Sequence, residues 1–368
     1  MRWNWFSRRP KAARRDAVPQ YTAWERRAFE QPGVPSGPLP YSTYDQMQSD
    51  SMVQTVLTVK KLGVLATSFS IQPASSSDAA KRNVDFVLEA FVRMEGSPNT
   101  ILAGAMDAFA KGWSVQEAIY SATQQPTTTN QQPRVWLEAI CPKDPSLFGL
   151  EVDPFGNITD LKLRIPGEPE RTLPREKFVL WANRDGYRQP KGRSDLDAAY
   201  PHWSAKQELL KGWKLHLQRF AMPTMLGRFQ RGVSAEEQNA LINQFRNLSQ
   251  QTGIVFPSEF EVSPLDVGKE PSQGFMDALD FHNREIARAV LGQTLTTDEG
   301  RRVGSLAMGK VHLQVLLLQL EALRRDLADR VMTEQVIRPL VELNFGPGEI
   351  PRFEFEPLKL DAFATGQV

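Results

Sequence analysis

The chain has 368 residues, of which 41% are hydrophobic and 24% charged, enough for a large core or for two to three linked domains. Its 44 basic and 43 acidic residues leave a formal net charge of +1, so contact with nucleic acid would need a local basic patch. The single cysteine, Cys141, excludes an internal disulfide framework and a four-cysteine zinc site and suits a reducing compartment.

Residues 1–40 predict a basic, proline-rich flexible arm. The first fifteen residues hold six Lys or Arg together with Trp3, Trp5 and Phe6, and no apolar run of signal-peptide length follows. Contact with nucleic acid or a membrane surface is one interpretation and a disordered tail is the other, which we favour. The sequence has no window of about twenty apolar residues, so we expect no membrane-spanning helix.

Residues 41–193 predict an α+β domain, and the fold class of the whole chain is therefore expected to be α+β. Apolar side chains recur at near-helical spacing between Asp45 and Thr67. Phe69 and Ile71 then alternate with polar residues and predict a short strand.

Two more helices and several strands are expected in the same domain. The first helix follows Ser77 as its N-cap, and the second runs from Thr100 to Gly112. The buried face of the first is expected to hold Val84, Val87, Leu88 and Phe91. Alternating residues predict strands at 134–140, 158–165 and 177–182. The low-complexity stretch 124–133 is expected to be an exposed loop.

A long helix is expected over 194–220, because the string S-D-L-D at Ser194 supplies an N-cap and an acidic residue in the first turn. Its apolar stripe is expected to consist of Trp203, Leu210, Trp213, Leu217 and Phe220. Four basic residues are interpreted as lying largely off that stripe: Lys206, Lys211, Lys214 and Arg219. They form either a functional basic side or an ordinary solvated face.

The remaining elements follow in order. Residues 221–268 predict a small α/β unit, 272–291 a second long helix, 292–304 a loop, 305–338 a very long helix that ends before Pro339, and 339–368 a tail with one alternating strand. A helix of more than thirty residues is well beyond the usual globular length, which suggests assembly.

The best enzymatic lead is a partial phosphate-binding motif. Gly304, Gly309 and Lys310 match G-x-x-x-x-G-K, but Val311 stands where the motif needs a hydroxyl, and the stretch is expected to form the first turns of a helix. The four histidines are scattered singly, without a metal-binding spacing. We therefore expect no catalytic residue, no cofactor and no metal, and favour a structural or binding protein.

Several strings together resemble the portal proteins of Mu-like tailed bacteriophages. They are IARAVLGQTLTTDEG and GSLAMGKVH, the segment from KGRSDLDAAYPHW to MLGRF, and GIVFPSEFEV, with further similarity in FAKGWSVQEAIY and LVELNFG. The resemblance implies a ring of around a dozen copies at the capsid vertex, through which double-stranded DNA is packaged and ejected. It implies as partners a terminase, a head-tail connector or adaptor, and the major capsid and scaffold proteins, with no membrane. The location implied is the virion, after assembly in the host cytoplasm.

The resemblance also assigns a role to each segment. It makes 41–193 the wing, 194–220 the first stem helix, 221–268 the clip, 272–291 the second stem helix, 292–304 a tunnel loop and 305–338 the long helix behind that loop. Relatives usually continue past Asp361 into a helical crown, whereas this chain ends at Val368. The crown is therefore expected to be absent or truncated.

DNA contacts are expected in the tunnel loop, from Gly292, Gln293, Thr294, Thr296, Thr297, Gly300, Arg301, Arg302 and Gly304. Its glycines give conformational freedom, its threonines can donate to phosphate oxygens, and its arginines add positive charge without reading base sequence. Asp298 and Glu299 keep such binding loose. The four basic residues of the first stem helix are candidates for the lumen, and Arg228 and Arg231 for the clip.

Two other functions stay open at this point. One is a head-to-tail connector or minor capsid protein that oligomerises but lacks a translocation loop. The other, from a different class, is an enzyme that binds nucleotide around Gly304 to Val311.

Overall fold

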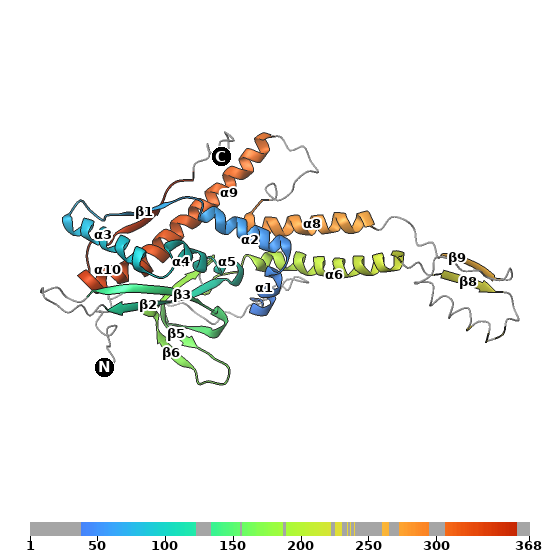
Figure 1. Cartoon of the computed structure of the whole chain (residues 1–368), viewed down its shortest axis with the longest axis horizontal. Coiled ribbons are helices and arrows are strands. Elements are labelled where there is room, and N and C mark those ends of the chain that lie inside the picture. The colour runs from blue at the N-terminus through green and yellow to red at the C-terminus, as the bar shows by residue number, and fades with distance from the viewer. Residues whose placement is uncertain are drawn as a thin grey trace. The chain divides into compact units, whose positions relative to one another are not determined.

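The computed structural model describes residues 38–122, 134–154, 157–186, 189–221, 225–229, 260–264, 272–293 and 306–358, together with Ser234, Glu236 and Asn239. The chain divides into two compact units, which are described in turn: Met1–Pro201 with Arg284–Val368, and His202–Asn283. Both hold helices and strands, so the predicted α+β class is confirmed (Figure 1). No helix in the described residues is long and apolar enough to cross a membrane.

The first unit starts with two helices where the sequence showed one apolar repeat. Helix α1 covers Tyr41–Gln48 and α2 covers Ser51–Val64. Asp50 separates them, because its carboxylate accepts from two backbone N–H groups at the start of α2 and thereby caps that helix. Strand β1, Phe69–Gln72, follows as predicted.

Helix α3, Asp78–Arg93, begins at the predicted cap, where the Ser77 hydroxyl accepts from the backbone N–H of Ala80 at 3.0 Å. Its buried face is rotated relative to the prediction. Leu88 is 43% exposed, whereas Phe86 is buried between aromatic rings, 5.0 Å from that of Trp136 and 5.1 Å from that of Phe345. The packing of aromatic rings around Phe86 therefore determines which side of α3 faces the core.

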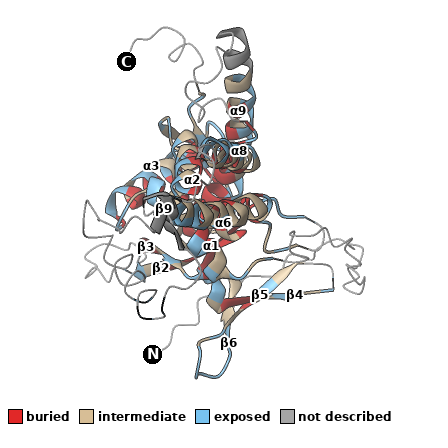
Figure 2. Cartoon of the chain, turned by 90° about the vertical axis from the view of Figure 1, so that its right-hand side faces the viewer, coloured by how far each residue is buried: buried red, intermediate tan, exposed pale blue. Residues whose placement is uncertain are grey.

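Two antiparallel sheets enclose a core cluster. Helices α4, Pro98–Ala105, and α5, Ala108–Lys111, lead through Gly112 into the first sheet, whose order is β3-β2-β7. Its strands are β2 Trp113–Ala122, β3 Val135–Lys143 and β7 Phe178–Ala182; the second sheet has β4 Phe148–Val152, β5 Ile158–Leu163 and β6 Arg171–Pro174. The predicted strands are present, while β4 and β6 were not predicted. Strand β6 is one edge of its sheet, and none of its four residues is buried (Figure 2).

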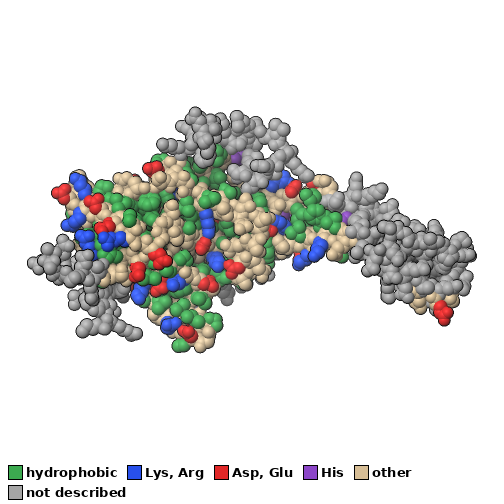
Figure 3. Space-filling model, in the orientation of Figure 1, with side chains coloured by type: hydrophobic (Ala, Val, Ile, Leu, Met, Phe, Trp, Pro, Cys, Tyr) green, Lys and Arg blue, Asp and Glu red, His purple; other side chains and the backbone are tan. Residues whose placement is uncertain are grey.

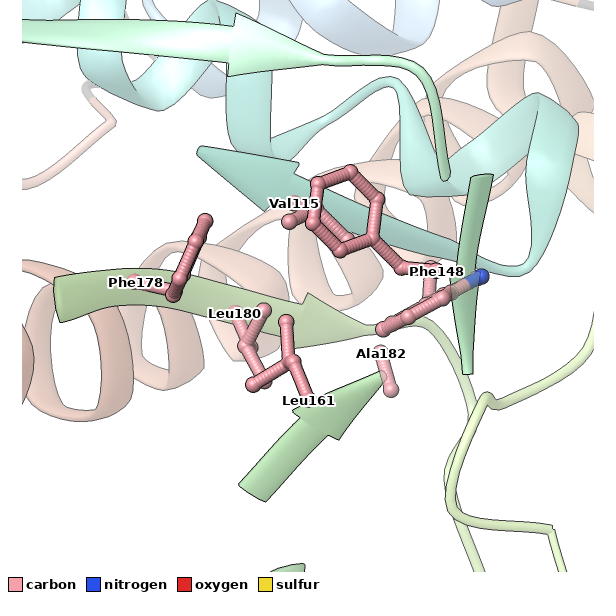
Figure 4. Packing of buried hydrophobic residues seen from close by; sticks show 7 residues of the cluster. Val115, Phe148, Leu161, Phe178, Leu180 and Ala182 are labelled. Carbon is pink, nitrogen blue, oxygen red and sulfur yellow. The ribbon is translucent and has the colours of Figure 1, made fainter. Parts of the chain in front are cut away.

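Side chains from both sheets form the cluster shown in Figure 4. Trp113 and Val115 of β2 and Phe178 and Leu180 of β7 pack with Phe148 and Leu161 from the second sheet and with Ala182. Trp113 is 2% exposed, and its indole N–H donates to the Tyr41 hydroxyl at 2.7 Å. The polar atom of the largest core residue is thus satisfied inside the fold.

The long helical segment does not end at Pro339, so that prediction is wrong. Helix α9, Leu306–Asp326, continues through a π-helical stretch, Leu327–Ile337, into α10, Arg338–Phe345 (Figure 1). Within the π-helical register the N–H of Arg338 donates to the carbonyl of Thr333, five residues earlier. Pro339 has no N–H to donate, and in an α-helix its ring would clash with the carbonyl of the residue four positions earlier. The π-helical register before it accommodates both properties.

Strand β10, Arg352–Phe355, closes this unit by pairing antiparallel with β1, as the alternation of the tail predicted. Arg324 of α9 is 1% exposed and donates to the carbonyl of Glu356 at 2.6 Å and to the Thr67 hydroxyl. The Arg324 side chain therefore links α9 by hydrogen bonds to Thr67, which precedes β1, and to Glu356, which follows β10.

Helix α6, Leu196–Ala221, starts in the first unit at a buried carboxylate. Asp195 is 0% exposed; it pairs with Lys60 of α2 at 2.6 Å, accepts from the Asn183 amide at 3.0 Å and contacts Arg184 at 3.2 Å. Burial lowers the pKa of Lys60, an effect that the nearby Asp195 charge opposes. Ser194 is buried beside it and its hydroxyl accepts from the N–H of Leu196 at 2.9 Å, consistent with a helix start at the predicted serine.

The second unit holds the paired parts of α6 and α8, with a small hairpin between them in sequence. Helix α8 covers Ser272–Leu291, as predicted. Strand β8, Met225–Phe229, pairs antiparallel with β9, Phe260–Pro264. Most of the predicted small α/β unit at 221–268 lies outside the described residues. In α6 the predicted apolar stripe is largely not buried, because Leu210 is 37% and Leu217 49% exposed.

The contribution of the buried Lys60–Asp195 ion pair to stability can be tested by comparing two substitutions. Asp195→Asn removes the carboxylate and leaves the Lys60 ammonium buried without its counter-charge, so we expect a loss of about 3–5 kcal/mol in the free energy of unfolding. Asp107→Asn breaks the Lys61–Asp107 pair, which has the same 2.6 Å separation but is solvent-exposed. Its expected cost is about 1 kcal/mol or less. Denaturant titration measures both; equal losses would contradict the role of burial.

Candidate functional site

The candidate site begins where α8 ends, at Gly292. Its φ is +72°, and its N–H donates to the carbonyl of Arg288 at 2.9 Å. A Cβ built on Gly292 would lie 2.9 Å from the Nε2 atom of Gln319 on α9. The left-handed φ favours glycine at this helix end, while the Gln319 amide, at the end of a flexible side chain, would only have to shift to make room for a Cβ. The sequence had suggested only conformational freedom at this position.

Gln293, the next residue, is buried at 3% exposure. This burial in the first unit does not favour the predicted contact between the Gln293 side chain and DNA. The other loop candidates lie outside the described residues: Thr294, Thr296, Thr297, Gly300, Arg301, Arg302 and Gly304.

On the far side of the loop, α9 begins at Leu306, so Gly309 and Lys310 lie in its first turns. This confirms the helical interpretation of the G-x-x-x-x-G-K string. A phosphate-binding loop needs its glycines and lysine in a loop that wraps the phosphates before a helix starts. The helical backbone at Gly309 and Lys310 does not provide that wrap.

Lys206 does not lie on an exposed basic side of α6. It is 7% exposed, and it stands three residues after Trp203 and four before Leu210. This spacing places Lys206 on the apolar stripe itself, so its assignment to the basic side was wrong. Lys211 and Lys214 are exposed, and Lys211 pairs with Glu208 at 2.8 Å. The side chains of Arg219, Arg228 and Arg231 lie outside the described set.

Two histidines that the sequence left unconnected meet in the second unit. The Nδ1 atoms of His202 on α6 and His282 on α8 are 3.2 Å apart, and the His216 ring lies 5.8 Å from that of Phe275. One imidazole must donate and the other accept in the first contact. Their separation of 80 residues hid this pairing, although both positions lie on the contacting sides of predicted helices. Among the described residues, no group of three or more His, Cys, Asp or Glu is arranged to hold a metal ion.

The left-handed backbone at Gly292 predicts that a substitution at this position lowers the stability of the protein. Gly292→Ala places a Cβ at a left-handed φ and against Gln319, so we expect a loss of about 1–2 kcal/mol in unfolding free energy. Gly274→Ala on the same helix is the control, since nothing lies within 4 Å of a Cβ there. That variant is expected to be neutral or more stable by up to about 1 kcal/mol. Thermal unfolding compares the two; a neutral Gly292→Ala would contradict the cap.

A family model described as the portal protein of Mu bacteriophage matches residues 41–365. The portal protein of Escherichia phage Mu is 24% identical over 311 residues, which cover 82% of this chain and 56% of that protein. Mu-like prophage FluMu protein gp29 of Haemophilus influenzae is 23% identical over 333 residues, 88% of this chain and 61% of that protein. The chain thus spans about three fifths of the length of these two relatives.

Solved structures show the same fold. A chain from the neck of an empty gene transfer agent particle computed with C6 symmetry superposes with a TM-score of 0.60 at 12% identity, covering 89% of this chain and 87% of that one. A chain from the neck of the native particle, computed with C12 symmetry, gives 0.59 at 13% identity with the same coverages. At such identities the likeness establishes the fold alone.

Proposed function

The chain belongs to the family of Mu bacteriophage portal proteins, and we propose that it assembles into a ring-shaped channel at a capsid vertex, through which double-stranded DNA is packaged and ejected. The observation that carries the proposal is the extent of the family match, residues 41–365, which includes both compact units, both helices of the α6–α8 pair and the loop after α8. We take the ring to hold around a dozen copies and to reside in the virion after assembly in the host cytoplasm.

The described geometry supports a conduit function. The loop 292–304 leaves α8 through a conformationally fixed glycine and rejoins the fold at α9, so both of its ends are held by long helices. In the proposed channel its threonines and arginines contact DNA phosphates, which gives binding without sequence preference. The neighbouring acidic residues limit the strength of that contact.

In this proposal the chain itself hydrolyses nothing. A separate ATP-driven terminase supplies the energy and docks on the clip, 221–268, which later receives the head-tail connector. Major capsid and scaffold proteins surround the ring at the vertex. The helical conformation of Gly309 and Lys310 supports a role without nucleotide hydrolysis.

The assembly is tested by native mass spectrometry and negative-stain class averages of the purified chain. We expect a closed ring with a central opening wide enough for duplex DNA. A protein that stays monomeric at high concentration would contradict the proposal. ATP hydrolysis that disappears in Lys310→Ala would instead favour a nucleotide-binding enzyme.

The loop distinguishes a portal from a head-to-tail connector or minor capsid protein. Replacement of residues 294–304 by a Gly-Ser linker of equal length, which keeps the Gly292 cap, is expected to leave ring formation intact and to reduce DNA packaging at least tenfold. The matched control replaces 124–133 in the same way and is expected to package normally. Normal packaging by the 294–304 variant would show that this segment is no translocation element.

A further inference from the structure

We propose that a hollow in the first unit binds a carboxylate that is attached to an apolar group. The hollow has a volume of about 520 Å³, within the size range of sites that bind small ligands. Side chains from β2, β5, β7, the turn after β7 and the π-helical stretch line it. Its described lining residues all lie in the first unit and outside the loop 292–304, so the inference goes beyond the proposed function.

The two carboxylates that line the hollow already have cationic partners. Asp185 accepts from the Arg330 guanidinium, with oxygen–nitrogen distances of 2.6 and 3.1 Å. Glu334 accepts two hydrogen bonds from Arg338, both at 2.7 Å. These hydrogen bonds lower the pKa of Glu334, so its carboxylate stays ionised at neutral pH. Each carboxylate is therefore neutralised within its own ion pair.

Arg175 is the unmatched charge of the lining. It stands in the turn between β6 and β7 and makes no ion pair with a carboxylate among the described residues. Its guanidinium donates to the Oε1 atom of Gln335 at 2.6 Å and to the carbonyl of Phe178, and both acceptors are neutral. Burial lowers the pKa of Arg175 to about 10, an effect that the Glu176 charge opposes, so the group is protonated at neutral pH. Since a guanidinium has five N–H donors, Arg175 keeps both a positive charge and donors for an anion.

Gln335 fixes the position of this guanidinium. Besides accepting from Arg175, its Oε1 atom accepts from the backbone N–H of Leu180 at 2.8 Å. Its amide nitrogen donates to the carbonyl of the same leucine at 2.8 Å, so the side-chain amide pairs with the edge of β7. Gln335 belongs to the π-helical stretch, and such wide turns are frequent at functional sites. A guanidinium held in this way loses little conformational freedom when an anion binds.

Apolar side chains line the same hollow. Leu180 and Ala182 come from β7, and both belong to the core cluster of Figure 4, which keeps this side of the hollow rigid. Ile158 is half-buried and Pro190 is exposed, so both offer apolar surface to a ligand. A ligand that carries a hydrocarbon group and an anionic group can therefore contact both parts of the lining.

The charges favour a carboxylate over a phosphate or DNA. On the face shown in Figure 3, Lys and Arg side chains lie near Asp and Glu side chains at several places, which limits sites with unmatched positive charge. Arg175 supplies one positive charge, which a monovalent carboxylate neutralises. A phosphate with two charges, or the row of phosphates along DNA, would be repelled by Asp185 and Glu334 in the same lining. The chemical class of the ligand is therefore an apolar monocarboxylate.

Phenylacetate and phenylacetamide test the recognition of charge with the unaltered chain. The two probes share an aromatic group, and only the carboxylate of phenylacetate can form an ion pair with Arg175. We expect phenylacetate to bind at least about fivefold more tightly than phenylacetamide at neutral pH, as measured by ligand-observed NMR titration. Equal affinities would overturn the inference.

Substitutions at Gly186 test whether the probe occupies this hollow. Gly186 lines the hollow, and nothing lies within 4 Å of a Cβ built there, so a side chain fits. Gly186→Asp adds a negative charge and is expected to weaken phenylacetate binding about fivefold. Gly186→Asn adds a neutral side chain of nearly the same size and is expected to stay within about twofold of the original protein. Equal binding by the two variants would place the probe elsewhere and contradict the proposed site.

A matched arginine pair tests the role of the unmatched charge. Arg175→Gln is expected to weaken phenylacetate binding about tenfold. Arg171→Gln is the control, because Arg171 is exposed and pairs with Glu168 at 2.8 Å outside the hollow, and it is expected to bind the probe normally. Circular dichroism confirms that both variants are folded. The same affinity in both variants would rule out Arg175 as the anion-binding group.

A blocked dipeptide, acetyl-phenylalanyl-glutamate amide, identifies the source of the carboxylate. Tighter binding of this peptide than of phenylacetate supports a segment of a protein as the ligand, whereas weaker binding supports a free organic acid. Both results keep the carboxylate site. Failure of the chain to form rings is a separate result, which would contradict only the proposed function.

Discussion

The buried carboxylate of Asp195 is the constraint on which the start of α6, in the first unit, depends. Its partners come from separate parts of the first unit: Lys60 from α2 and Asn183 with Arg184 from the turn after β7. The backbone N–H of Asp195 also donates to the carbonyl of Phe109 at 2.8 Å. A charge in this position is tolerated because these groups satisfy it, so the start of α6 depends on the elements that supply them.

The backbone around this carboxylate is correspondingly tight. Arg184 has a φ of +50°, uncommon for a residue with a side chain, and its guanidinium reaches Asp195. A Cβ on Gly192 would lie 2.3 Å from the carbonyl oxygen of Asn183 and 2.6 Å from that of Gly112. The strained arginine and the required glycine are both explained by one need, which is to bring three chain segments within hydrogen-bond distance at the base of a long helix.

Local signals were enough to predict elements that have strong caps or strict alternation. Ser77 and the extent of α8 were placed correctly, because a cap residue and a run of buried positions at 3.6-residue spacing are read from neighbours in sequence. Strands β4 and β6 were missed, because short strands at the edges of a sheet need little apolar alternation. The π-helical passage to Pro339 was missed for a different reason: the sequence shows the missing N–H but not the register that accommodates it.

For the candidate site, the sequence predicted where residues lie along the chain better than it predicted which other residues surround them. The glycine at the end of α8 was recognised, but its contact with Gln319 comes from a helix that follows in sequence and could not be read from the loop. Lys206 shows a second kind of error. Because lysine is charged, it was assigned to the exposed side of α6, although its spacing places it on the apolar stripe. Spacing fixes the face of a helix, and a long lysine stem can be buried along that face.

The charge pattern of the first unit fits the proposed conduit, in which DNA is not held strongly. Many of its basic side chains lie beside carboxylates, as in Arg330 with Asp185 at 2.6 Å, Lys143 with Glu117 at 3.1 Å and Arg171 with Glu168 at 2.8 Å. Such pairs present little net field beyond a Debye length of about 8 Å at physiological salt. Strong binding to duplex DNA comes from many unpaired cations that release counterions together. In the proposed channel, a net charge of +1 and ion pairs of this kind would favour weak contact with DNA, and weak contact lets a polymer slide.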